Sequence, residues 1–283
     1  MSHEQQTIIE AFGLSHVGTV REENQDAIHL CDETDEFTSL YGHLYAVADG
    51  MGGYAHGGEA SKIALTVFCD AFYAGSGNPI VQKMKTGIQN ANIGVYQAAR
   101  RLKAGRMGTT LTAVHIHGRM LHGIHVGDSR AYLLRDGKST CLTNDHTRVG
   151  ELVRMKILSP EKVRTHSQRS MLNRSIGLEL FVQPDQFRLP LREDDLIVLC
   201  SDGVWSVIED DEFADFARGT RSAEQLCSTL IDEAMRRESD DNLSVVTLRM
   251  HSLVDHPSSH TGTGVWGKIP GLFRRLSGRE GKT

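Results

Sequence analysis

The sequence predicts an α+β protein whose strands are antiparallel and whose helices form separate layers. Two segments with helical spacing follow each other directly, at residues 60–71 and 79–102. Four strand-like runs then come close together between residues 111 and 142, with Gly118-Arg119 and Asp136-Gly137 at hairpin positions. A parallel sheet would instead alternate strands and helices one by one. We expect the four runs to form one antiparallel meander.

The remaining elements are predicted from apolar spacing and capping signals. They are a first strand at Phe12–Val20, a strand at Leu44–Ala48, a small helical insertion with a mobile loop over residues 145–190, a strand at Asp194–Ser201, a helix from about Ser222 with Gln225 completing a capping box, and a last strand at Leu243–Leu248.

Composition places the chain among ordinary globular proteins. It has 283 residues, of which 39% are hydrophobic and 24% charged. No run approaches the length of a membrane span and the start lacks a signal pattern, so we expect a cytoplasmic protein. The five cysteines are scattered, which fits reduced thiols, and the net charge of −5 argues against nucleic-acid binding.

The C-terminal segment differs from the rest in charge. From His251 onward the net charge is +3, which leaves about −8 for residues 1–250. We predict a catalytic domain at 1–250 and, at 251–283, a polar linker followed by a basic tail. Trp266, Ile269, Phe273 and Leu276 give residues 265–283 amphipathic spacing. This tail either contacts an acidic membrane surface or a protein partner, or it frays or packs on its own domain.

Four carboxylates stand at the ends of predicted strands. Asp49, Asp128 and Asp202 follow apolar runs, and Asp241 precedes the last one. If these ends converge, the carboxylates repel one another unless a cation neutralises them. Mg²⁺ or Mn²⁺ prefers such oxygen ligands, and the backbone of Gly50 can approach a metal closely.

Two such ions about 3.5–4 Å apart would lower the pKa of a bridging water and generate a hydroxide nucleophile. Arg21 is a candidate for gripping a phosphate group bidentately. The sequence therefore favours a phosphohydrolase.

Six short motifs carry a resemblance to the protein phosphatase 2C family, the metal-dependent Ser/Thr protein phosphatases, in a form that looks bacterial. In order they are Arg21 to Asp26, Asp49-Gly50-Met51-Gly52-Gly53, Gly108-Thr109-Thr110, Gly127-Asp128-Ser129-Arg130, Ser201-Asp202-Gly203 and Asp241-Asn242. The resemblance spans about Phe12 to Arg249. It implies a four-layer α/β/β/α sandwich, in which helix pairs flank two antiparallel sheets.

The resemblance also implies a role for each site residue. Asp49 would bridge two metals, Gly50 would give its carbonyl to one, and Asp202 and Asp241 would complete the other site. Asp128 would hold a third ion together with Asp202. Asp26 would orient the attacking water and Arg21 would hold the substrate phosphate.

The implied reaction is direct attack of the hydroxide on phosphoserine or phosphothreonine, without a phosphoenzyme. Residues 147–176 match the family's flap, where substrates are selected. The implied partners are phosphoproteins that are targets of a Ser/Thr kinase, and we expect a monomer.

Three positions depart from the family pattern: Met51, Tyr54 and Gly58. They leave His56, Tyr54 or a metal-bound water as the proton donor to the leaving group, and we favour water. Trp205-Ser206 also replaces a more usual acidic ending.

Three other classes of protein are alternatives to this interpretation. Residues 50–55 satisfy a G-x-G-x-x-G/A dinucleotide pattern, with Asp70 about twenty residues on, but no βαβ alternation follows. A phosphatase-fold module that binds partners without turnover is a second alternative. A thiol-based phosphatase is disfavoured, because no Cys is followed six positions later by Arg.

Overall fold

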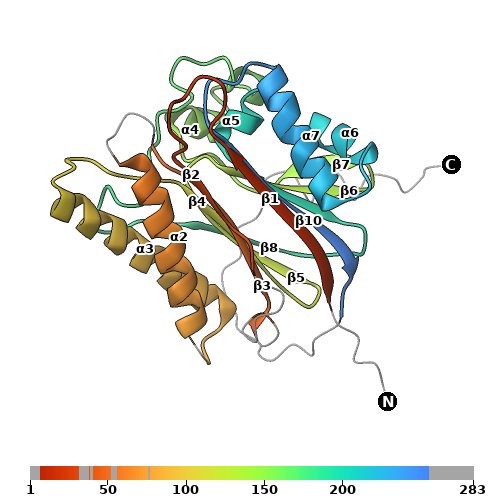
Figure 1. Cartoon of the computed structure of the whole chain (residues 1–283), viewed down its shortest axis with the longest axis horizontal. Helices are drawn as coiled ribbons and strands as arrows, with labels where there is room; N and C mark the ends of the chain where they lie inside the picture. Colours follow the sequence, from red (N-terminus) through yellow and green to blue (C-terminus); the bar gives the residue numbers. More distant parts are fainter. Residues whose placement is uncertain (1–6, 32–37, 39–40, 52–55, 76, 255–283) are drawn as a thin grey trace.

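Two antiparallel sheets packed face to face form the centre of the molecule, and a pair of helices covers each outer face (Figure 1). The computed structural model describes residues 7–31, 38, 41–51, 56–75 and 77–254. Helices α2 (Gly57–Ala74) and α3 (Ile80–Leu102) cover one sheet, and α6 (Glu212–Arg218) and α7 (Ala223–Arg236) cover the other. The predicted four-layer α/β/β/α sandwich is confirmed.

Among the described residues, each sheet has five strands, and their pairings are all antiparallel. The first sheet runs in the order β1 (Ile8–His16), β10 (Leu243–Ser252), β9 (Leu196–Cys200), β6 (Arg130–Arg135) and β7 (Lys138–Cys141). The second runs β2 (Asp26–His29), β3 (His43–Asp49), β4 (Leu111–His117), β5 (Met120–Val126) and β8 (Asp185–Pro190).

The predicted four-stranded meander is wrong. The strand positions are right, but β4 and β5 form a hairpin in the second sheet and β6 and β7 form one in the first. Gly127 lies between the two hairpins with φ of +113°, and a Cβ there would sit 2.5 Å from Thr110. This glycine conformation lets the chain leave one sheet and enter the other at Asp128, which places that carboxylate at the junction of the sheets.

Two further expectations need correction. The first strand runs from Ile8 to His16 rather than over Phe12–Val20, because its partner β10 begins at Leu243, opposite His16. The insertion at 145–190 contains helix α4 (Arg148–Arg154) and the 3₁₀ turn Pro160–Lys162, but it ends in strand β8. Phe187 and Leu189 alternate with exposed residues there and enter the core between the sheets.

Of the three helices between residues 202 and 236 in the described part of the chain, the sequence predicts one. Helix α7 begins after Ser222, whose hydroxyl accepts the Gln225 amide at 3.0 Å, as the capping pattern predicts. The four-residue α5 (Asp202–Trp205) and α6 were not predicted, since neither is long enough to show a helical period. Residues 255–283, on which the tail prediction falls, lie outside the described residues.

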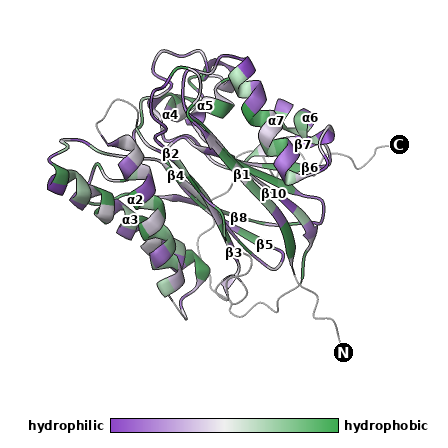
Figure 2. Ribbon diagram, viewed as in Figure 1, coloured by the Kyte–Doolittle hydropathy of each residue, from purple (hydrophilic) through white to green (hydrophobic). Residues whose placement is uncertain are grey.

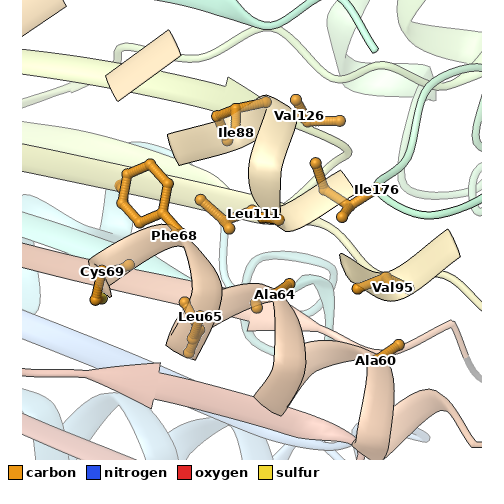
Figure 3. Packing of buried hydrophobic residues seen from close by; sticks show 14 of the residues in the cluster. Ala60, Ala64, Leu65, Phe68, Cys69, Ile88, Val95, Leu111, Val126 and Ile176 are labelled. Atoms are coloured by element: carbon orange, nitrogen blue, oxygen red, sulfur yellow. The ribbon is translucent and has the colours of Figure 1, made fainter. Parts of the chain in front are cut away.

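A separate hydrophobic core fills each gap between layers. Apolar positions in Figure 2 accordingly concentrate on the inward faces of the helices and along the strands. Figure 3 shows the core under α2 and α3, where Phe68 and Ile88 meet Leu111 and Val126 of the sheet. Gly87 lets the two helices approach, because a Cβ there would lie 2.8 Å from the Phe68 ring. Within the described part of the chain, no helix has the length and apolarity needed to cross a membrane.

His122 is a partly buried histidine of the second sheet, and its shifted pKa predicts that the folded state loses stability in acid. Burial lowers the pKa of His122 to about 4, helped by the nearby positive charge of Arg188. An unfolded histidine titrates near 6.5, so below that pH the unfolded chain binds a proton that the folded chain does not. Stability contributed by neutral His122 is therefore lost as pH falls from about 6.5 toward 4.

Replacing His122 with glutamine should remove this part of the pH dependence. Relative to His122→Gln, the parent should lose about 1–2 kcal/mol more of its free energy of unfolding between pH 7 and pH 5. Urea unfolding at both pH values measures the difference, with the exposed His16→Gln variant as control. Parallel pH profiles for His122→Gln and the parent would contradict the argument.

Candidate active site

A cavity of about 440 Å³ opens at the end of the sandwich where the predicted carboxylates gather. Its lining comes from both sheets and from the flap, defined as residues 147–176. The lining residues are Arg21, Asp49, Met51, Thr110, Asp128, Arg169, Ser170, Leu172, Asp202, Gly203, Ser206, Asp240 and Asp241. Five of the seven predicted site residues therefore face one space.

Strands of the second sheet position Asp49 at the cavity and Asp26 behind it. Asp49 ends β3 directly opposite Asp26, the first residue of β2. Thr110 fixes this end of the strand: its hydroxyl accepts the Asp49 amide at 2.9 Å, and its own amide donates to the Asp49 carbonyl at 2.8 Å. Asp26 is only 6% exposed and accepts a 2.7 Å hydrogen bond from the Ser201 hydroxyl. It supports the site without lining the cavity.

Neighbouring strands of the first sheet bring Asp128 and Asp202 together. Arg130 at the start of β6 pairs with Cys200 at the end of β9, so each carboxylate lies two residues beyond a paired position. Asp202 is the first residue of α5. Asp241 precedes β10, the strand on the other side of β9.

The carboxylates disfavour ionisation in one another. Burial raises the pKa of Asp49 and Asp128 well above the ordinary value, and the charges of neighbouring carboxylates raise them further. Burial and Asp241 likewise raise the pKa of Asp202 to about 6, although a hydrogen bond with Asp49 opposes the rise. A cavity with this donor set holds protons or cations in preference to bare negative charge.

The donor chemistry fits a hard divalent cation that keeps several waters. Among the described residues, no three acidic, histidine or cysteine side chains stand close enough to enclose an ion by themselves. Gly50 can add a backbone ligand, since its amide donates to the Gln25 carbonyl while its own carbonyl accepts no bond from the described residues. A Cβ at Gly50 would lie 2.3 Å from the Gly57 carbonyl oxygen, so the close approach excludes any larger residue. Carboxylates, one carbonyl and water form a typical Mg²⁺ or Mn²⁺ set.

Arg21 lies at the rim, above the acidic cluster. Its Nη2 is 2.7 Å from Asp241 Oδ2, and its Nε donates to the Asp240 carbonyl at 3.1 Å. The guanidinium is partly exposed and can reach an anion in the cavity.

The candidate proton donors are placed differently. Met51 lines the cavity, but its thioether has no acidic proton to donate. His56, the residue before α2, is exposed, and its Nδ1 lies 3.4 Å from a carboxylate oxygen of Glu59 in the first turn of that helix. Tyr54 lies outside the described residues.

Several lining residues were not singled out as site residues from the sequence. Arg169, Ser170 and Leu172 come from the flap, and only contacts distant in sequence bring them to the cavity. Thr110 was visible in the Gly108-Thr109-Thr110 motif, although its role in fixing Asp49 was not. Ser206 follows α5, which itself was not predicted.

Comparison with known proteins agrees with this geometry. Residues 10–243 match the family described as Protein phosphatase 2C. The chain belongs to the protein phosphatase 2C family. The dinucleotide alternative is wrong, because β3, which precedes the glycine run, lies antiparallel between β2 and β4, and all strand pairings among the described residues are antiparallel.

Individual members of the protein phosphatase 2C family are similar over most of the chain. Serine/threonine protein phosphatase PstP of Mycobacterium tuberculosis is 32% identical over 90% of this chain, which spans only 47% of that relative's length. Serine/threonine phosphatase stp of Listeria welshimeri is 30% identical over 81% of this chain and 91% of its own. The structure of a PstP catalytic domain in complex with two manganese ions matches with a TM-score of 0.75 and 28% identity, covering 87% of this chain and all of that one.

The crowded carboxylates of this protein phosphatase 2C domain predict opposite effects of one substitution with and without metal. Asp49→Asn should raise the melting temperature in chelator, because it removes one buried charge from the cluster. The same change should abolish most of the stabilisation by Mg²⁺ or Mn²⁺, which in the parent is about 2.7 kcal/mol at a hundredfold excess over Kd. Thermal unfolding with metal and with chelator measures both effects. The exposed Asp232→Asn is the control, and a parent unaffected by either ion would contradict the assignment.

Proposed function

We propose that the chain is a metal-dependent phosphoprotein phosphatase that hydrolyses phosphoserine and phosphothreonine. One observation carries the proposal: carboxylates from the ends of both sheets converge on a cavity that has Arg21 at its rim. The names of its relatives and the two manganese ions in a similar structure support it.

The site residues divide into metal ligands and Asp26, which would orient the attacking water. Asp49 and the Gly50 carbonyl would serve one ion, Asp49 with Asp202 and Asp241 a second, and Asp128 with Asp202 a third. Mg²⁺ and Mn²⁺ both suit these ligands. When bound, the ions supply positive charge and an acidified water for attack on phosphorus.

Side chains of the protein would bind the phosphate and orient the attacking water. Arg21 would turn from Asp241 to bind the phosphate oxygens, for which its planar fork is suited. Asp26, whose burial raises its pKa to about 7, would orient the attacking water through its carboxylate, while Ser201 holds that carboxylate in place. Water would donate the proton to the leaving group, since Met51 has no acidic proton and His56 does not line the cavity.

The charge of the flap supports phosphoproteins as substrates. Residues 147–176 hold seven Lys and Arg against two Glu, a net charge of +5 in a chain whose total is −5. Such a surface attracts phosphorylated and acidic segments. We further propose that the substrates are targets of a Ser/Thr kinase and that the protein is a cytoplasmic monomer. Residues 265–283 would contact a membrane or a protein partner.

A catalytically weak binding module is the alternative, and one substitution separates it from an enzyme. Asp202→Asn should lower kcat for a phosphothreonine peptide by at least about 100-fold, because the ligand sites lose a charge that metal binding requires. Phosphate release is measured with Mn²⁺, with excess chelator and in the Asp232→Asn control. Activity that persists in Asp202→Asn or in chelator would overturn the proposed chemistry.

The assignment of the proton donor is tested at His56. His56→Gln should leave kcat within about twofold of the parent across pH 6 to 9, because a bystander contributes no proton. If His56 were the general acid, His56→Gln would instead lower kcat about 100-fold and remove one limb of the pH–rate profile. Such a loss would reassign the donor from water to His56.

A further inference from the structure

A buried cluster behind the cavity connects two of the carboxylate-bearing loops. Trp205, at 2% exposure, is the last residue of α5 and follows Asp202 by three positions. Its indole Nε1 donates a 2.8 Å hydrogen bond to the main-chain carbonyl of Asp128. One side chain thus links the Asp202 helix to the Asp128 turn.

Arg130 fixes the plane of this indole. Its guanidinium carbon lies 3.6 Å from the centroid of the Trp205 ring. Its Nε and Nη2 donate to the two Asp145 oxygens at 2.9 and 2.7 Å, and its Nη1 donates to Asp210 at 3.1 Å. A buried guanidinium with both edges paired has little freedom to move, so the stacked ring has little either.

Arg164 extends the cluster into the flap. Its Nε donates to the Trp205 carbonyl at 2.9 Å, and its Nη2 donates to the Ile208 carbonyl at 3.1 Å and to Asp210 Oδ1 at 2.7 Å. Its Nη1 lies 2.9 Å from a Glu209 oxygen. The Arg164 side chain is 11% exposed, whereas its partners Glu209 and Asp210 are 60% and 50% exposed, so the bonds to the Trp205 and Ile208 carbonyls are the better shielded ones.

Asp210 joins the two arginines. Its Oδ1 accepts from Arg130, from Arg164 and from the Tyr132 hydroxyl. Burial opposes its ionisation, but the two guanidinium charges hold its pKa below the ordinary value. Asp210 therefore connects Arg164 of the flap to Arg130, the arginine that stacks on Trp205.

We propose that Arg164 and Asp210 are positioning residues that hold the flap against α5, next to Trp205, while the Asp128 and Asp202 loops keep their own contacts. Arg164 does not line the cavity, yet Arg169, five residues later, does. Fixing residue 164 limits where Arg169 and the two residues that line the cavity beside it can lie. The flap would then contact the protein part of a substrate from a defined position, an inference that rests on the proposed phosphoprotein substrate.

Substrate size separates this role from a general loss of activity. Arg164→Gln should raise KM for a phosphothreonine peptide about 5- to 10-fold, while kcat/KM for p-nitrophenyl phosphate stays within about twofold. The small substrate needs only the phosphate site. Arg164→Lys keeps the charge but loses the planar guanidinium, so its KM for the peptide should lie between those of the parent and Arg164→Gln.

Arg154→Gln is the matched control, because Arg154 lies in the same segment but, among the described residues, its ion pair is with Glu151 of its own helix. Equal effects of Arg164→Gln on both substrates, or equal behaviour of Arg164→Gln and Arg154→Gln, would overturn the proposal. Circular dichroism of each variant confirms that it is folded.

Fluorescence gives a readout that does not depend on turnover. The sequence has two tryptophans, so in a Trp266→Phe background the emission comes from Trp205 alone. Arg164→Gln should shift this emission to the red and increase its quenching by acrylamide, and Arg154→Gln should not. Unchanged emission in Arg164→Gln would also contradict the proposal.

A peptide-binding assay separates failure of the positioning role from failure of the proposed function. If the parent hydrolyses neither substrate, the proposed function fails. The positioning role is then decided by anisotropy of a labelled phosphothreonine peptide, whose Kd should rise about 5- to 10-fold in Arg164→Gln. An unchanged Kd there would refute it.

Discussion

Repulsion among buried carboxylates is the constraint on which the rest of this structure depends. Asp49, Asp128, Asp202 and Asp241 share one cavity, and the pKa values of the first three are raised by burial and by one another. A fold optimised for stability alone would not gather them, since each unneutralised charge costs free energy. Protons or bound cations relieve this repulsion, and divalent cations at this position are what the proposed function requires.

The two-sheet sandwich is what makes this gathering possible. The pair β2 and β3 places Asp26 behind Asp49, while the adjacent β6 and β9 place Asp128 beside Asp202. A single sheet would spread these ends along one edge, about 4.8 Å per strand. Packing two sheets face to face instead lets their ends surround a space, and Gly127 permits the crossing between them.

Local pattern predicted most elements here, whereas their partners depended on distant contacts. The long helix at 79–102 and the strand pair at 111–126 show clear apolar periods, and both were predicted within a few residues. Periodicity reports which face of a strand is buried but not which sheet it joins, so the split meander was missed. Strand β8 gains its place only by pairing with β5, some sixty residues earlier. The carboxylates were predictable because each follows or precedes an apolar strand, while the bridging roles of Trp205 and Thr110 required coordinates.

The flap resolves an electrostatic conflict that the carboxylates create. A phosphate entering an acidic cavity is repelled, and bound cations remove this repulsion only near the ligands themselves. The net charge of +5 on residues 147–176 extends positive potential outward to where the proposed protein substrate would approach. Not all of that charge faces outward, because Arg164 is turned inward onto Asp210 and Glu209. One basic residue thus anchors the segment, and anchoring keeps the others near the cavity, so attraction and positioning depend on the same short stretch of chain.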